Sequence, residues 1–313
     1  MKTIRIMTGL LVVILAALPM VNQAQTPPTV ARQSVLVTGA STGIGRKITE
    51  RLAADGYFVF AGARQEKDLK ALGAIRNVQP IQLDVTKPSD IDAAVAIVSK
   101  SGRGLYGLVN NAGVASRGSV AAMDMKEFDL LIAVNLMGPF QVTRAFEPLI
   151  MAQHGRITTI GSIAGVLADA GVPGNVPVTA YTMSKHAMEA FTDSLALQVE
   201  PQGVQVSIIE PGNYDSDISK NAVLRTGGDP SRGNRSMYKP PDEVAEAVEM
   251  ALFEPKPKRR YLVAPNEGEA ELTIRKQIKQ LVQLNEGQRY TYDRAALIRM
   301  LDEAMAGSRP KTK

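Results

Sequence analysis

A glycine-rich loop between an apolar segment and a helix constrains this chain more than any other feature. The run SVLV is followed at once by TGASTGIG, residues 38–45, and an amphipathic segment begins there. Glycines at 39, 43 and 45 permit a tight turn and let the backbone approach a pyrophosphate closely. The helix that follows presents unpaired N–H groups and its positive dipole end to an anion. This order of strand, loop and helix predicts a nucleotide-binding βαβ unit.

The rest of the body repeats the same alternation. Several apolar segments have no polar alternation, which is typical of parallel strands covered on both faces. Expected strands are 34–38, 57–61, 78–83, 105–110, 155–160, 204–210 and 260–264, and expected helices are 45–54, 68–73, 88–100, 125–153, 182–199 and 241–253. Right-handed crossovers then give an α/β fold with a doubly wound parallel sheet of the Rossmann type. We expect one catalytic domain over residues 31–265 and a helical extension over 266–313.

The first 25 residues form a separate segment. Lys2 and Arg5 precede an apolar run, 6–20, and a polar stretch follows. This pattern predicts a signal peptide or an N-terminal membrane anchor, and so an exported or membrane-associated protein. Translation from Met20 is a third interpretation, which would leave the protein in the cytoplasm.

Composition excludes several classes of chemistry. The chain has 313 residues with no cysteine, so thiol catalysis, disulfides and thiolate metal sites are excluded. His154 and His186 are the only histidines, and we expect no metal centre. A net charge of +5 spread along the chain does not predict nucleic-acid binding.

Seven short motifs in register resemble the short-chain dehydrogenase/reductase family over roughly residues 34–264. They are TGASTGIG, Asp84-Val85, the NNAG run at 110–113, Asn135, Ser162, the YTMSK run at 181–185, and Pro211-Gly212. The resemblance implies a bound nicotinamide nucleotide. It implies that the nucleotide contacts Thr38, Gly39, Ser41, Thr42, Gly43, Ile44, Gly45, Arg64, Asp84, Val85, Asn111, Ala112, Gly113, Tyr181, Lys185, Pro211 and Gly212.

The end of the second expected strand predicts NADP rather than NAD. NAD-binding proteins of this type carry an acidic residue there for the ribose hydroxyls. This chain has Ala63 followed by Arg64, and a guanidinium can pair with a 2′-phosphate. Arg46 could supply a second positive contact.

Tyr181 and Lys185 are four residues apart and so share one face of a helix. A neighbouring ammonium favours a phenolate and can lower the pKa of the tyrosine. The family resemblance assigns Tyr181 as general acid/base, Lys185 as its assistant, Ser162 as the group that holds the substrate oxygen, and Asn135 as part of a proton relay. His186 should face elsewhere on the helix, and Glu189 and Asp193 should lie on a solvated or subunit-facing surface.

The sequence says less about the substrate-binding residues than about the residues that bind the nucleotide. The family often has a threonine after Pro211-Gly212, but here Asn213 and Tyr214 follow. Residues 215–237 occupy the place of the family's lid, and the tail resembles the hydroxysteroid and retinol dehydrogenase branch. This implies an alcohol or ketone substrate, lipophilic in character, and a homo-oligomer formed through the Tyr181 helix and the helix before it. Two alternatives stay open: a non-catalytic NADP-binding sensor or scaffold, and a nucleotide-sugar epimerase-type relative.

Overall fold

The computed structural model describes residues 33–168 and 177–308. Its centre is a seven-stranded sheet in the order β3-β2-β1-β4-β5-β6-β7, in which every neighbouring pair is parallel. The strands are β1 (Ser34–Val37), β2 (Phe58–Ala63), β3 (Val78–Gln82), β4 (Gly107–Asn110), β5 (Arg156–Ile160), β6 (Gln205–Pro211) and β7 (Arg260–Val263). The order reverses between β1 and β4, which opens a crevice at their carboxyl ends. The predicted doubly wound fold is confirmed.

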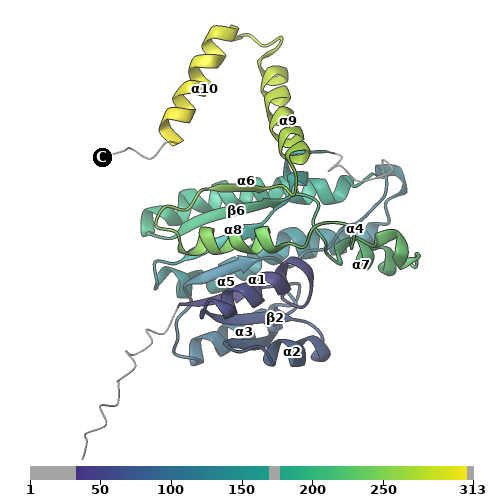
Figure 1. Cartoon of the computed structure of the whole chain (residues 1–313), viewed down its shortest axis with the longest axis vertical. Coiled ribbons are helices and arrows are strands. Elements are labelled where there is room, and N and C mark those ends of the chain that lie inside the picture. The colour runs from purple at the N-terminus through teal and green to yellow at the C-terminus, as the bar shows by residue number, and fades with distance from the viewer. Residues whose placement is uncertain (1–32, 169–176, 309–313) are drawn as a thin grey trace, which may run out of the picture. The chain divides into compact units, whose positions relative to one another are not determined.

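Helices cover both faces of this sheet (Figure 1). They are α1 (Gly43–Ala54), α2 (Glu66–Gly73), α3 (Pro88–Lys100), α4 (Met125–Ile132), α5 (Gly138–Met151), α6 (Thr179–Val199) and α8 (Asp242–Phe253). The short helix α7 (Ile218–Arg225) instead packs against Pro230–Gly233. The expected helix over 125–153 is divided: α4 and α5 are joined by a π turn, Ala133–Met137. The sequence pattern is continuous through this turn, so periodicity alone could not reveal it.

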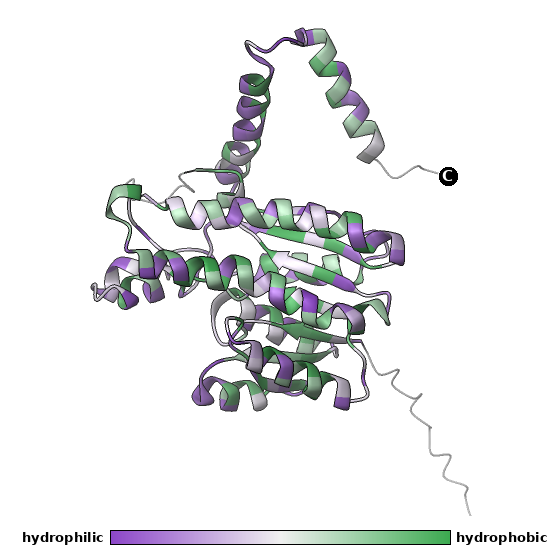
Figure 2. Cartoon of the chain, turned by 180° about the vertical axis from the view of Figure 1, so that it is seen from behind, coloured by the Kyte–Doolittle hydropathy of each residue, from purple (hydrophilic) through white to green (hydrophobic). Residues whose placement is uncertain are grey.

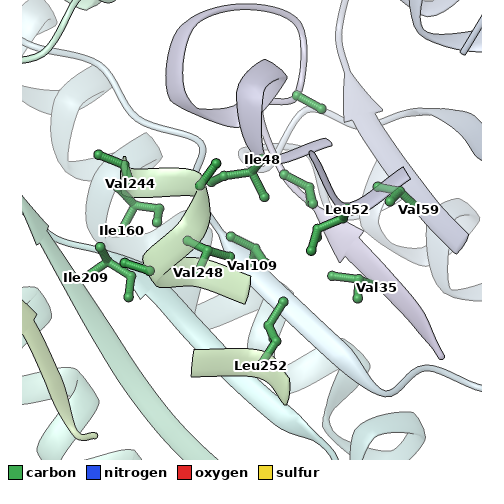
Figure 3. Close-up of a cluster of buried hydrophobic side chains, with 14 of the residues drawn as sticks. Val35, Ile48, Leu52, Val59, Val109, Ile160, Ile209, Val244, Val248 and Leu252 are labelled. Atoms are coloured by element: carbon green, nitrogen blue, oxygen red, sulfur yellow. The ribbon is translucent and has the colours of Figure 1, made fainter. Parts of the chain in front are cut away.

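One apolar core lies between the sheet and helices α1 and α8. Side chains of alternate strand residues such as Val35 and Val109 meet Leu52 of α1 and Val248 and Leu252 of α8 (Figure 3). Each of these side chains is fully buried, which stabilises the folded state by roughly 1.5–3 kcal/mol apiece. This packing fixes the start of α1 beside the end of β1.

A second core lies on the opposite face, under α3, α5 and α6. Leu36 and Leu108 point to this side, because successive strand residues face opposite ways. They meet Val98, Phe146 and Val199 of the three helices. Figure 2 shows the resulting pattern, with apolar residues in the strands and polar ones on the outer helix faces.

The expected C-terminal helices are also present, as α9 (Glu267–Asn285) and α10 (Arg294–Ser308). Asn266 caps α9, since its side chain accepts a hydrogen bond from the Glu269 N–H at 3.0 Å. In the described ranges, no helix has the length and apolar character needed to cross a membrane. The predictions for residues 1–25 lie outside the described residues.

Candidate active site

A cavity of about 430 Å³ opens at the carboxyl ends of the central strands. It brings together residues from the glycine loop, the ends of β2 to β6, α6 and the segment 211–238. The sequence-predicted residues that line it are Gly39, Ser41, Thr42, Gly43, Ile44, Gly45, Arg64, Asp84, Val85, Asn111, Ala112, Gly113, Ser162, Tyr181, Lys185, Pro211 and Gly212. Thr38 and Asn135 do not line it; both are buried directly behind it.

Thr38 and Asn111 tie the glycine loop to the loop that follows β4. The Thr38 hydroxyl oxygen accepts hydrogen bonds from the N–H groups of Asn111 and Ala112, each at 3.0 Å. In return, the Asn111 amide donates to the carbonyl oxygens of Thr38 and Gly39 at 2.9 and 3.1 Å. Thr38 thus acts through these loops, without facing the cavity.

The glycines of the loop are required by their conformations and neighbours. Gly39 has a φ of +65°, and a Cβ there would lie 2.8 Å from the Ala112 Cα. A Cβ at Gly45 would collide with the Gly39 carbonyl oxygen and the Asn111 amide nitrogen. Thr42 precedes α1 without capping it through its side chain, so the first N–H groups of α1 remain available to a ligand in the cavity.

Near the carboxyl ends of β2 and β3, the cavity is lined by the basic Arg64 and the acidic Asp84. Arg64 lines the cavity directly after Ala63, the last residue of β2. Partial burial pushes the pKa of Asp84 upward, but hydrogen bonds from Thr86 and the charges of Arg64 and Lys87 hold it below its ordinary value. Asp84 therefore stays ionised at neutral pH. Arg46, expected as a second positive contact, instead pairs with Glu50 at 2.6 Å and is not among the described residues lining the cavity.

Lys185 lies at the floor of the cavity on α6. Its Nζ donates a hydrogen bond to the Ile160 carbonyl oxygen at 2.8 Å and lies 5.7 Å from the centre of the Tyr181 ring. Burial lowers the pKa of Lys185 to about 8, although Glu189 acts in the opposite direction. The ammonium is thus held close to Tyr181 by the end of β5.

The surroundings of Tyr181 act on its pKa in opposite directions. Burial raises the pKa of its phenol, while a hydrogen bond with Ser162 and the charge of Arg235 act to lower it. The Lys185 Nζ donates its hydrogen bond to the Ile160 carbonyl oxygen and lies 5.7 Å from the centre of the Tyr181 ring. The phenol is therefore protonated at neutral pH and can donate a proton.

Asn135 sits in the π turn between α4 and α5. Its Oδ1 accepts from the Val114 N–H at 2.8 Å, and its Nδ2 donates to the Val114 carbonyl oxygen at 2.9 Å and to the Ser184 hydroxyl at 3.1 Å. All three side-chain bonds hold the cavity wall and the Tyr181 helix together.

The sequence analysis does not identify Arg235, which lines the cavity together with Tyr181 of α6. It lies in the segment 215–237, for which the sequence predicts only a lid. The sequence analysis also predicts Glu189 on a solvated or subunit-facing surface, and the structure differs. Glu189 packs against Gly165 and pairs with Arg260 at 3.1 Å, with Glu210 of β6 beside it. His186 and Asp193 are exposed, as expected.

Comparison with known proteins places the fold and motifs in one family. A family model described as short chain dehydrogenase matches residues 33–226. The chain belongs to the short-chain dehydrogenase/reductase family. It is a short-chain dehydrogenase/reductase in which the glycine loop and the YTMSK run fall within the matched region, whereas the part of the cavity wall that includes Arg235 lies beyond it.

Several members are similar to this short-chain dehydrogenase/reductase. Mitochondrial D-beta-hydroxybutyrate dehydrogenase of Bos taurus is 36% identical over 59% of this chain and 55% of its own length. Retinol dehydrogenase 5 of Mus musculus is 34% identical over 61% of this chain and 60% of its own length. The chain therefore spans little more than half the length of these relatives.

Solved structures of other proteins have a similar fold. A short-chain dehydrogenase from Streptomyces avermitilis superposes with a TM-score of 0.67 and 27% identity, covering 83% of this chain and 99% of its own. An actinorhodin polyketide ketoreductase solved with NADPH gives a TM-score of 0.64 and 27% identity, over 74% of this chain and 95% of its own.

Proposed function

We propose that this protein is an NADP-dependent oxidoreductase that moves a hydride between nicotinamide and an alcohol or carbonyl substrate. The observation that carries the proposal is that Tyr181, Ser162 and Lys185 line the same cavity as the glycine loop. A non-catalytic sensor would not need a proton donor, its hydrogen-bond partner and a buried lysine on one cavity. The loop spacing 39, 43, 45 also differs from the loop of epimerase-type relatives, which disfavours that alternative.

The residues present fit a dinucleotide. The glycine loop leaves the space that a side chain would otherwise fill, and the N-terminus of α1 suits a pyrophosphate. Asp84, Asn111 and Gly212 would contact the remainder of the nucleotide. When bound, NADP supplies or accepts the hydride.

Arg64 supports NADP over NAD. Ala63 stands where the acid is expected, so a repulsive charge is absent, and Arg64 beside it supplies a guanidinium for a 2′-phosphate. No carboxylate within the described ranges forms an ion pair with Arg64.

The protein's own residues provide the proton chemistry. Tyr181, protonated at neutral pH, would donate its proton to a substrate carbonyl oxygen in reduction and recover it in oxidation. Ser162, bonded to the same phenol, would hold and polarise that oxygen. Lys185 would support the tyrosine and bind the nicotinamide ribose. Asn135 would keep the cavity wall in position for this group.

The substrate would be an alcohol or ketone with an apolar body. Val114, Val178 and Met237 line the cavity near Tyr181 and suit hydrocarbon. One relative is named for retinol, which agrees with this expectation; another is named for hydroxybutyrate.

Self-association and export also remain proposals. Phe140 of α5 and Met183 and Leu197 of α6 are exposed, which supports a homo-oligomer through these two helices. Light scattering would measure the mass in solution. Residues 1–25 would export the protein or attach it to a membrane, which cell fractionation would detect.

The proposed function is tested by titrating the full chain with NADPH and NADH, then adding ketones, aldehydes and steroids. We expect tighter binding of NADPH and oxidation that depends on substrate. Tyr181→Phe should lower turnover by about 10²- to 10⁴-fold while nucleotide binding is kept. Tyr290→Phe, at an exposed tyrosine outside the cavity, is the matched control. An unchanged rate in Tyr181→Phe would refute the assigned role.

A further inference from the structure

Arg235 is held rigidly on the wall of the cavity. Its Nε donates to the Tyr214 carbonyl oxygen and its Nη2 to the Asn213 Oδ1, each at 3.0 Å. Its guanidinium carbon lies 4.5 Å from the centre of the Tyr238 ring. A guanidinium fixed by two hydrogen bonds and one aromatic face loses little further entropy when it binds a ligand.

This half-buried cation forms no ion pair with a carboxylate of the described residues. No carboxylate in 33–168 or 177–308 forms an ion pair with Arg235 or with Arg117. The charge of Glu269 acts to raise the pKa of Arg235, but this carboxylate accepts a hydrogen bond from the Asn213 N–H and does not pair with the guanidinium. Burial, with the charge of Arg117, lowers the pKa of Arg235. An unpaired, partly desolvated charge is costly, so a ligand anion would stabilise it.

Arg225, in the same segment, differs from Arg235 in having a carboxylate partner. Arg225 pairs with Glu127 at 3.2 Å and donates to the Ala115 carbonyl oxygen at 2.6 Å. It therefore fastens α7 to the loop after β4 and is satisfied by the protein. Arg235 has no such carboxylate and faces the cavity.

Arg235 is also near the reacting group. Its charge acts on the Tyr181 phenol, and both side chains line the cavity together with Arg117. An anion held by Arg235 would thus lie close to the oxygen that Tyr181 and Ser162 hold.

We infer that Arg235, assisted by Arg117, binds a carboxylate of the substrate, so that the enzyme acts on hydroxy acids and oxo acids whose reacting carbon lies a few bonds from the carboxylate. This inference rests on the proposed function and narrows its substrate class. The apolar side chains Val114, Val178 and Met237 would receive the hydrocarbon part of the same molecule.

The binding test does not depend on turnover. The full chain is saturated with NADPH, and calorimetry measures binding of 2- and 3-hydroxyoctanoate, of their methyl esters and of 2-octanol. NADPH and an alcohol cannot react with each other, so the complex is stable. We expect at least one acid to bind about tenfold or more tightly than its neutral ester and the alcohol, because it adds charge-assisted hydrogen bonds.

Arg235→Gln should abolish this preference by weakening acid binding alone, and Arg235→Lys should retain part of it. Arg64→Gln is the matched arginine variant: it should weaken NADPH binding and keep the preference for the acid. If Arg235→Gln instead weakens NADPH binding, the arginine serves a nucleotide phosphate and the inference is wrong. Equal binding of acids and esters would overturn it as well, even if the protein reduces neutral ketones and the proposed function stands.

Discussion

Gly45 leaves the space that the side-chain amide of Asn111 occupies. A Cβ at Gly45 would overlap that amide nitrogen and the Gly39 carbonyl oxygen to which the amide donates. The first turn of α1 and the loop after β4 can approach each other only because this residue has no side chain.

Gly45→Ala should therefore weaken both folding and nucleotide binding. Alanine inside a helix normally stabilises it by about 0.5–1 kcal/mol relative to glycine, so a loss of stability would reveal the collision. We expect a lower unfolding temperature and weaker NADPH binding, measured by thermal denaturation and nicotinamide fluorescence. Gly268→Ala in α9, where the nearest atom to a new Cβ is 3.4 Å away, should not lower the unfolding temperature and should leave NADPH binding unchanged.

Arg64→Gln tests the nucleotide preference. If the guanidinium pairs with a 2′-phosphate, the variant should bind NADPH about tenfold or more weakly and NADH almost unchanged. Arg76→Gln, at an exposed arginine outside the cavity, serves as control. Similar affinities of the wild-type chain for NADPH and NADH would contradict the assignment before any variant is made.

The free energy of unfolding should depend on pH through the Glu210 carboxyl group. Burial, and then the charge of Glu189, raises the pKa of Glu210 to about 7 from an ordinary value of 4.5. The folded chain thus keeps a proton that the unfolded chain releases, and this stabilising contribution is complete below about pH 4.5 and lost as pH rises through about 7. Denaturant unfolding of wild type and Glu210→Gln across this window should differ by on the order of 1–3 kcal/mol.

The glutamine variant should show the flatter curve, since it cannot release a proton. Glu286→Gln, at an exposed position, should follow the wild type. Parallel curves for wild type and Glu210→Gln would show that Glu210 titrates as an ordinary carboxyl.

Asn135→Asp should damage the cavity wall. The new carboxylate can still accept from the Val114 N–H, but its second oxygen would face the Val114 carbonyl oxygen, to which Asn135 now donates. We expect a loss of about 1–3 kcal/mol in unfolding free energy. Turnover should fall more than nucleotide affinity, because the Tyr181 helix shifts. Ser184→Ala removes only one of the three hydrogen bonds and should have a smaller effect.

The sheet could be predicted from sequence because each strand is a short apolar run with a helix after it. The glycine loop could be located because a phosphate-binding turn demands glycine at defined places. Arg235 could not be assigned, since its significance depends on Asn213 and Tyr214, two residues far enough away that only folding brings them to it. The environment of Glu189 could not be predicted for the same reason, because its neighbours Glu210 and Arg260 belong to strands later in the chain.

The π turn at Asn135 sets the angular phase of α5, the helix that continues from it. An α-helix advances by about 100° per residue, so one residue added or removed within this turn would rotate α5 by that angle. Val142, Phe146 and Ile150 would then point away from the sheet, and Thr143 would leave its hydrogen bond with Asn110. The number of residues between Asn135, which supports the cavity wall, and the residues of α5 that fill the core therefore matters as much as their identity, and an insertion or deletion within the turn would disrupt both at once.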